Sequence, residues 1–199
     1  RETLAAGMLL AAGWEPNAPL IDPFCGSGTL PIEAALLARR VAPGKNRRFA
    51  FMDWRNFDAG AWRKLLAEAA GQELPAAPAP ILAADRDAGA IEMAQSNARR
   101  AGVLGDITFA CQAVSNLAPP PGPGWVVCNP PYGVRVSPTR DLRNLYARFG
   151  DVLRAACPGW QVGMLCSDAI LAGHTHLPFQ RELALVNGGI GVRLYVGAV

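Results

Sequence analysis

Apolar and polar residues follow two patterns along this chain. Short, continuous apolar runs predict buried strands, and longer stretches with apolar residues at helical spacing predict amphipathic helices. The expected strands cover residues 20–24, 81–84, 107–110, 125–128, 162–166, 179–186 and 191–196. The expected helices cover residues 2–12, 29–40, 61–70, 88–101 and 141–156. Because strands alternate with helices, the pattern predicts an α/β fold with a mostly parallel, doubly wound sheet.

The last two expected strands break this alternation. Only Asn187-Gly188-Gly189 separates them, and this sequence is a signal for a tight hairpin turn. We therefore expect a seven-stranded sheet that ends in an antiparallel hairpin. This ending is similar to that of Rossmann-like methyltransferases and differs from that of most dehydrogenases.

The composition is that of one globular domain. The 199 residues are 51% apolar and 18% charged, which excludes a disordered chain. No apolar run reaches the ~18 residues that a membrane span requires, and the apolar segment 4–14 lacks the features of a signal peptide. We interpret residues 1–199 as a single domain in which residues 41–79 form an insertion. Because a helix is expected directly after Arg1, we interpret the chain as a fragment that lacks an upstream portion.

Cysteine usage and net charge indicate a cellular setting. The five cysteines, at positions 25, 111, 128, 157 and 166, form no C-x-x-C pair. We expect buried free thiols in a reducing cytoplasm rather than disulfides or metal ligands. The formal net charge of +3 permits a nucleic-acid partner without demonstrating one.

The most informative stretch is Asn129-Pro130-Pro131-Tyr132, which directly follows the expected strand 125–128. Consecutive prolines lack the N–H groups that a strand ladder needs, so the chain leaves the sheet at Asn129. Ligands of open α/β sheets bind at this carboxyl edge. An amide, a stiff turn and an aromatic ring suit a flat heteroaromatic amine, although a simple strand-ending turn is the alternative. The tetrapeptide resembles the Asn-Pro-Pro-Tyr motif of S-adenosylmethionine-dependent methyltransferases that modify exocyclic amino groups.

A Gly-rich turn follows the first expected strand, with the sequence Asp22-Pro23-Phe24-Cys25-Gly26-Ser27-Gly28-Thr29. Glycines let the backbone turn tightly and approach a ligand, and the following helix presents free N–H groups. The carboxylate of Asp22 would repel a phosphate, but it can accept hydrogen bonds from the ammonium group of a bound amino acid. The segment is similar to the first methyltransferase motif, which implies that Asp22 and residues 24–29 cradle the methionine half of S-adenosyl-L-methionine.

An acidic residue ends the second expected strand. Asp85, followed by Arg86 and Asp87, is placed to accept both ribose hydroxyls of a nucleoside cofactor. The alternative for Asp85 is a cap of the helix 88–101, but Asp87 is the better-placed cap. We therefore expect Asp85 and Arg86 at the cofactor.

The segment after the third expected strand departs from the methyltransferase pattern. Methyltransferases often carry an acid there that binds the adenine amino group, whereas the matching position in this chain is Ala113. Gln112, Ser115 or backbone groups remain as candidates for that contact.

Together these segments resemble the family of RNA methylases that includes the THUMP-domain guanosine methyltransferases of ribosomal and transfer RNA. The resemblance rests on residues 1–6, 22–35, 42–44, 47–49, 54, 85–87, 129–132, 187–188 and 193–194. It implies methyl transfer from S-adenosyl-L-methionine to the exocyclic amino group of guanosine in ribosomal or transfer RNA. It also implies that Thr3 and its neighbours close over the cofactor. Family members usually recognise RNA through a separate N-terminal domain, which is absent from this sequence.

The resemblance and the chemistry of an aromatic amine predict roles for the catalytic turn. The Asn129 side-chain carbonyl and the Pro130 backbone carbonyl can each accept one amine N–H and orient the nitrogen toward the methyl group. Tyr132 can stack on the base and fix its plane. A duplexed base cannot reach such a slot, so the nucleotide must be flipped or single-stranded.

Other functions share some of these features. Enzymes that methylate the adenine amino group of DNA or RNA, or a glutamine side chain of a protein, carry the same Asn-Pro-Pro-Tyr turn and are alternatives. A non-catalytic cofactor-binding module on RNA is a further alternative, and it would explain why Ala113 stands where an acid is usual.

His174 and His176 are interpreted as a surface loop and not as a metal site. The basic residues of segment 39–48 and three arginines after the turn are candidates for RNA phosphates. Those three are Arg135, Arg140 and Arg143.

Overall fold

The computed structural model describes residues 1–132 and 139–199, and it contains one mixed sheet in the order β3-β2-β1-β4-β5-β7-β6. The five parallel strands are β1 (Leu20–Asp22), β2 (Ile81–Asp85), β3 (Ile107–Cys111), β4 (Trp125–Cys128) and β5 (Gln161–Cys166). The terminal strands β6 (Phe179–Asn187) and β7 (Ile190–Ala198) form an antiparallel hairpin, and β7 also pairs antiparallel with β5. The predicted seven-stranded sheet with an antiparallel ending is therefore confirmed.

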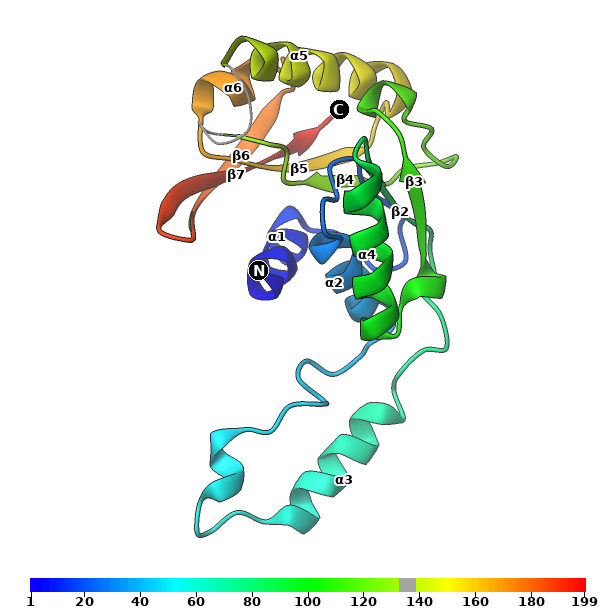
Figure 1. The fold of residues 1–199 in the computed structure, drawn as a ribbon, viewed down its shortest axis with the longest axis vertical. Coiled ribbons are helices and arrows are strands. Elements are labelled where there is room, and N and C mark those ends of the chain that lie inside the picture. The colour runs from blue at the N-terminus through cyan, green and yellow to red at the C-terminus, as the bar shows by residue number, and fades with distance from the viewer. Residues whose placement is uncertain (133–138) are drawn as a thin grey trace.

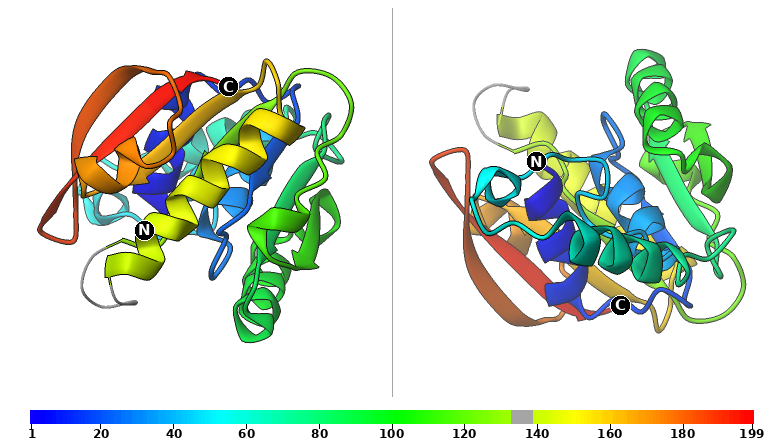
Figure 2. Two further views of the ribbon diagram at one scale, coloured as in Figure 1. Left: turned by 90° about the horizontal axis from the view of Figure 1, so that it is seen from above. Right: turned by 90° about the horizontal axis from the view of Figure 1, so that it is seen from below.

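Helices cover both faces of the sheet (Figure 1). One face carries α1 (Glu2–Ala12), α2 (Thr29–Ala38) and α4 (Ala88–Ala101), and the other carries α5 (Thr139–Ala156) and α6 (Ala169–Gly173). The long helix α5 runs diagonally across its face in the view from above (Figure 2). Two apolar layers therefore enclose the sheet and leave the ends of its strands for a ligand.

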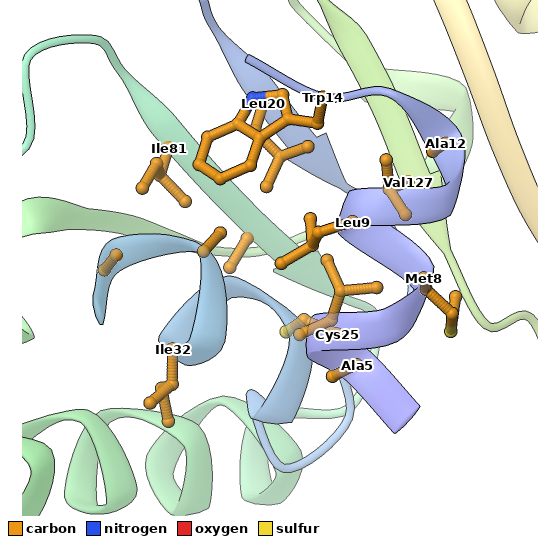
Figure 3. Close-up of a cluster of buried hydrophobic side chains, with 14 of the residues drawn as sticks. Ala5, Met8, Leu9, Ala12, Trp14, Leu20, Cys25, Ile32, Ile81 and Val127 are labelled. Carbon is orange, nitrogen blue, oxygen red and sulfur yellow. The ribbon is translucent and has the colours of Figure 1, made fainter. Parts of the chain in front are cut away.

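The first apolar layer depends on the helical spacing of small and large residues in α1. Ala5, Met8, Leu9 and Ala12 recur at intervals of three and four, so they share one face and pack on the sheet and α2 (Figure 3). Gly163 of β5 lets this helix approach closely, because a Cβ atom at Gly163 would lie 2.9 Å from the Cβ of Ala12.

The second apolar layer depends on the same spacing in α5. Leu142, Tyr146, Phe149 and Leu153 are buried and lie on one stripe of the helix. Their burial removes large apolar surfaces from water, and it fixes the side of α5 that faces the sheet.

Residues 41–79 form an arm that projects away from the sheet (Figure 1). The arm contains a short 3₁₀ helix, η1 (Ala50–Asp53), and the helix α3 (Ala59–Ala70). Its base is tied to the domain by Arg39, which donates hydrogen bonds to the carbonyls of Leu74 and Gly102 and pairs with Asp106 at 3.3 Å. The arm is thus anchored at its base while its far end extends from the body.

Some local expectations are corrected. β1 ends at Asp22 and not at residue 24, because the Phe24 N–H bonds the Asp22 carboxylate and turns the chain. The helix α6 was not expected from the sequence, although Asp168 caps it by accepting the N–H groups of Ile170 and Leu171. Cys111 is exposed at the end of β3, whereas the other four cysteines are buried free thiols as predicted. Within the described residues no helix is both long and apolar enough to cross a bilayer.

Candidate active site

A cavity of about 730 Å³ opens at the carboxyl ends of β1 to β4. Its volume is in the range of small-molecule and cofactor sites. Four segments that follow strands contribute to the wall, and so does the first half of α5. The lining residues are Pro23, Phe24, Asp85, Arg86, Asp87, Gln112, Ala113, Val114, Ser115, Asn129, Pro131, Leu142, Asn144, Leu145 and Arg148.

The Gly-rich turn after β1 is held in a fixed shape beside this cavity. Gly26 and Gly28 have positive φ angles of 51° and 82°, which glycine adopts without strain. A Cβ atom at Gly28 would lie 2.9 Å from the Cβ of Ala94, so α2 and α4 can approach only over a glycine. Asn97 of α4 donates a hydrogen bond of 2.8 Å to the Ser27 carbonyl. The turn therefore presents the free N–H groups at the start of α2 on a rigid support.

Asp85 connects the turn to the end of β2. One carboxylate oxygen accepts the Gly26 N–H at 3.0 Å, and the other accepts the Asp87 N–H at 3.0 Å. Asp85 is half-buried and lines the cavity, and a carboxylate oxygen that accepts one hydrogen bond can accept another. Asp87 caps α4 through the N–H groups of Gly89 and Ala90, as expected from the sequence.

Asp22 directly precedes the lining residues Pro23 and Phe24 and is only 2% exposed. Its carboxylate accepts the Phe24 N–H at 3.1 Å. Burial raises the pKa of Asp22 from 3.8 to about 7, and the nearby charge of Asp85 adds to this effect, while the Phe24 hydrogen bond opposes it. A buried carboxylate of this kind gains most from a positively charged partner.

The raised pKa of Asp22 predicts a pH-dependent stability. The folded chain retains a proton that the unfolded chain loses between about pH 4 and about pH 7, so the free energy of unfolding should fall by roughly 4 kcal/mol across that window. Asp22→Asn should remove this fall and become more stable than the native chain at about pH 8, as measured by urea denaturation at both ends of the window. Asp151→Asn is the control, because the Asp151 carboxyl is 63% exposed. Parallel pH profiles for the native chain and Asp22→Asn would contradict the assignment.

The turn of residues 129–132, which is predicted to be catalytic, begins where β4 ends. Asn129 is exposed and lines the cavity, whereas Pro130 is buried. The buried hydroxyl of Tyr146 donates to the Pro131 carbonyl at 3.3 Å and lies 3.3 Å from the sulfur of Cys166. The core of α5 therefore fixes the proline pair and holds Asn129 at the edge of the cavity.

Tyr132, at the other end of this turn, is tied to the terminal hairpin. Its hydroxyl accepts a hydrogen bond of 3.1 Å from the side-chain amide of Asn187, at the end of β6. The ring is half-buried and packs against both apolar layers. The hairpin turn thus helps to set the plane of the ring next to Asn129.

Residues 1–195 match the protein family described as RMKL-like, methyltransferase domain. The chain belongs to the RMKL-like methyltransferase family.

Relatives in this family are longer than the chain. The ribosomal RNA large subunit methyltransferase K/L of Shewanella sp. (strain MR-4) is 40% identical over 196 residues, which are 96% of this chain and 27% of the relative. SMU.472, crystallised with SAH, is 30% identical and has a TM-score of 0.92. The match covers 98% of this chain and 52% of the SMU.472 chain. A protein from Listeria monocytogenes str. 4b F2365, named as a predicted N6-adenine-specific DNA methylase, has a TM-score of 0.85 and 34% identity over 98% of this chain and 50% of its own. The chain spans about a quarter of the curated relatives and about half of these solved chains. The family resemblance and the Rossmann-like fold are confirmed.

The methyltransferase domain brings together many of the predicted site residues. The cavity is lined by Phe24, Asp85, Arg86, Gln112, Ala113 and Asn129. The remaining predicted residues are not among the lining residues: Thr3, Asp22, Cys25, Gly26, Ser27, Gly28, Thr29, Pro130 and Tyr132. Thr3 is exposed at the start of α1, and its closure over a cofactor stays a prediction.

The wall contributed by α5 was missed from the sequence. Asn144 and Arg148 are one helical turn apart, so both turn the same face of α5 to the cavity. Phe149 of the same helix contacts Phe24 edge-to-face, with ring centroids 5.3 Å apart, and holds that ring in the wall. The helical spacing of apolar residues in α5 could have indicated these two residues, because polar positions beside an apolar stripe lie at the margin of the core.

Other candidates of the sequence are placed away from the cavity. His176 is exposed and His174 ends α6, and the described residues contain no cluster of three metal-ligating side chains. Arg39 and Lys45 are engaged by Asp106 and Glu73, so they fasten the arm instead of remaining free for phosphates. Arg143 is exposed on α5, whereas Arg135 and the side chain of Arg140 lie outside the described residues.

Proposed function

We propose that the chain is the catalytic domain of an S-adenosyl-L-methionine-dependent methyltransferase that modifies the exocyclic 2-amino group of guanosine in RNA. Large-subunit ribosomal RNA is the first substrate to test, because the curated relative is a ribosomal RNA large subunit methyltransferase. One observation carries the proposal: Asn129 of the catalytic turn and Asp85 of the nucleoside-binding strand line the same cavity.

The residues present fit the cofactor. Asp85 offers oxygen lone pairs for ribose hydroxyls, and Gln112 and Ser115 line the adjacent wall where an adenine amino group would lie. The buried Asp22 is suited to the ammonium group of the methionine half, since that charge would compensate a carboxylate held away from water. A solved relative crystallised with SAH supports this choice of cofactor.

The chain's own residues orient the amine that is methylated. The bound cofactor supplies an electrophilic methyl group, so the enzyme need only position and localise the nitrogen lone pair. The Asn129 side-chain carbonyl and the Pro130 carbonyl can each accept one N–H, which favours a tetrahedral nitrogen over a planar one. With the cofactor bound, the nitrogen held by these two carbonyls would take the methyl group as the bond from methyl to sulfur breaks, and it would then release its proton to water. Tyr132, held by Asn187, can stack on the base while this occurs.

Calorimetric titration with S-adenosyl-L-methionine and with its demethylated product tests the cofactor assignment. We expect both ligands to bind. An affinity weaker than millimolar for both would refute the proposal that the chain is a methyltransferase using this cofactor. Mass analysis of nucleosides after incubation with unmodified large-subunit ribosomal RNA then identifies the product. N2-methylguanosine is the expected result.

Adenine is the second candidate base. The Listeria relative, named as an N6-adenine-specific DNA methylase, is 34% identical to this chain, and the same turn chemistry suits an adenine amino group. The same mass analysis with unmethylated DNA and RNA decides between the bases. Methyladenosine without methylguanosine would replace our proposal with this one.

A further inference from the structure

The far end of the arm is a small aromatic cluster without a deep core. The arm tip (residues 47–57) contains Phe49, Phe51 and Phe57, and Phe49 and Phe51 pack on Trp62 of α3 with ring centroids 6.0 and 5.2 Å apart. No residue of the arm is fully buried. Trp54 lies at the edge of the cluster, 6.4 Å from Phe51, and 66% of it is exposed. An exposed tryptophan on a preformed support is a surface for another molecule.

Positive charge is concentrated on and beside the arm. Residues 39–79 hold eight of the 19 Lys and Arg residues but only four of the 16 Asp and Glu residues. Arg47, Arg48 and Arg55 are exposed on the same tip as Trp54. The guanidinium of Arg47 lies 5.4 Å from the centre of the Phe49 ring. Arg48 pairs with Asp53, but the two side chains are 70% and 63% exposed, so that pair is weak and a phosphate can compete for it.

The arm tip points toward the side of the molecule that carries the turn of the β6–β7 hairpin (Figures 1 and 2). Figures 1 and 2 show the η1 end of the arm, the N-terminus and the turn of the β6–β7 hairpin toward one side. That hairpin turn bonds Tyr132 of the catalytic turn through Asn187. The arm tip is therefore on the side of the molecule from which the hairpin reaches Tyr132 (Figures 1 and 2).

We propose that the arm tip binds single-stranded RNA next to the modified nucleotide, with Trp54 stacked on a base and Arg47, Arg48 and Arg55 at phosphates. The inference rests on the proposed function, because it takes RNA as the substrate. The chemistry favours RNA over a protein partner: the cores of protein interfaces are depleted of charge, whereas exposed aromatic rings among arginines suit a strand of stackable bases and phosphates. Stacking also explains a requirement for unpaired bases, since paired bases hide their faces.

Fluorescence anisotropy with a labelled single-stranded oligouridylate tests the surface directly. Trp54→Ala should weaken binding by roughly tenfold, and Trp54→Phe should restore most of it because a ring is retained. The double variant Arg47→Glu/Arg55→Glu should lower the affinity further and reduce the slope of log affinity against log salt by about two. Cofactor affinity by calorimetry should remain at the native value for every variant.

Matched variants separate a specific surface from general effects. Leu65→Ala removes another exposed apolar side chain of the arm, 57% exposed, and should leave RNA affinity unchanged. Arg99→Glu/Arg100→Glu makes the same change in net charge at the last turn of α4, near the base of the arm and not at its tip, and should have a much smaller effect. Native RNA affinity in Trp54→Ala and in the arginine double variant would overturn the proposal. So would a shift in sedimentation that shows these residues joining two copies of the chain while RNA affinity stays native.

The two proposals fail in different ways. A native chain that binds no S-adenosyl-L-methionine and transfers no methyl group removes the proposed function. If the native chain methylates RNA and the arm variants bind and methylate RNA equally well, only the proposal for the arm tip is refuted.

Discussion

Asn129→Ala should abolish methyl transfer, with a fall in kcat of roughly 10³-fold, while S-adenosyl-L-methionine still binds within several-fold of the native affinity. The physical reason lies in the position of the side chain. Asn129 is exposed and lines the cavity, where we propose that its side-chain carbonyl accepts an amine N–H. The Gly-rich turn, in contrast, is held by Asp85 and Asn97 and does not depend on Asn129.

Single-turnover methylation and calorimetry on the same preparation measure the two effects separately. Asn17→Ala is a suitable control, because Asn17 is exposed in the loop before β1, at the opposite edge of the sheet. It should retain native transfer and native affinity. Loss of cofactor binding in Asn129→Ala would instead assign Asn129 to the cofactor, and retained transfer would show that another group holds the amine.

Much of the fold could be predicted because its signals are local. Trp125–Cys128 is a short apolar strand stopped by two prolines, and Ala88–Ala101 is a helix between the cap Asp87 and the stop Gly102, so both were predicted with their observed bounds. β3 is less regular: it extends one residue beyond the expected run and leaves Cys111 exposed. An apolar residue at the end of a strand is buried only if a helix or loop packs over it. The local sequence does not show where the packed helices end.

The parts of the fold and of the site that could not be predicted depend on contacts between distant segments. Arg39 and Asp106 are 67 residues apart, and nothing near either one marks them as partners. The cavity face of α5 is set by how Tyr146 and Phe149 pack on the sheet, so the positions of Asn144 and Arg148 follow only from the assembled core. The motif residues were predictable for the opposite reason: they lie at the carboxyl ends of neighbouring parallel strands, which the topology brings to one edge.

Gly150→Ala should cause the largest loss of stability of any glycine-to-alanine change in this domain, because its added Cβ would make the shortest contact. A Cβ atom at Gly150, in the middle of α5, would lie 1.8 Å from the carbonyl oxygen of Thr175 and 2.7 Å from its carbonyl carbon. Both are backbone atoms, and Arg154 also donates to the Thr175 carbonyl at 2.7 Å, so the loop cannot move away freely. We expect a loss of roughly 3 kcal/mol or more in the free energy of unfolding, which corresponds to a fall of about 10 °C in Tm.

The same substitution in α1 gives the control with the opposite sign. Gly7 is exposed in the helix, and a Cβ atom there would meet no other atom within 4 Å. Gly7→Ala should therefore stabilise the chain by up to ~1 kcal/mol through helix propensity alone. Gly150→Ala would gain the same helix propensity. It therefore destabilises the chain only if the clash with Thr175 costs more free energy than this gain. Urea denaturation of the two variants measures the difference, and equal stability of Gly150→Ala and the native chain would show that α5 can shift away from the loop without cost.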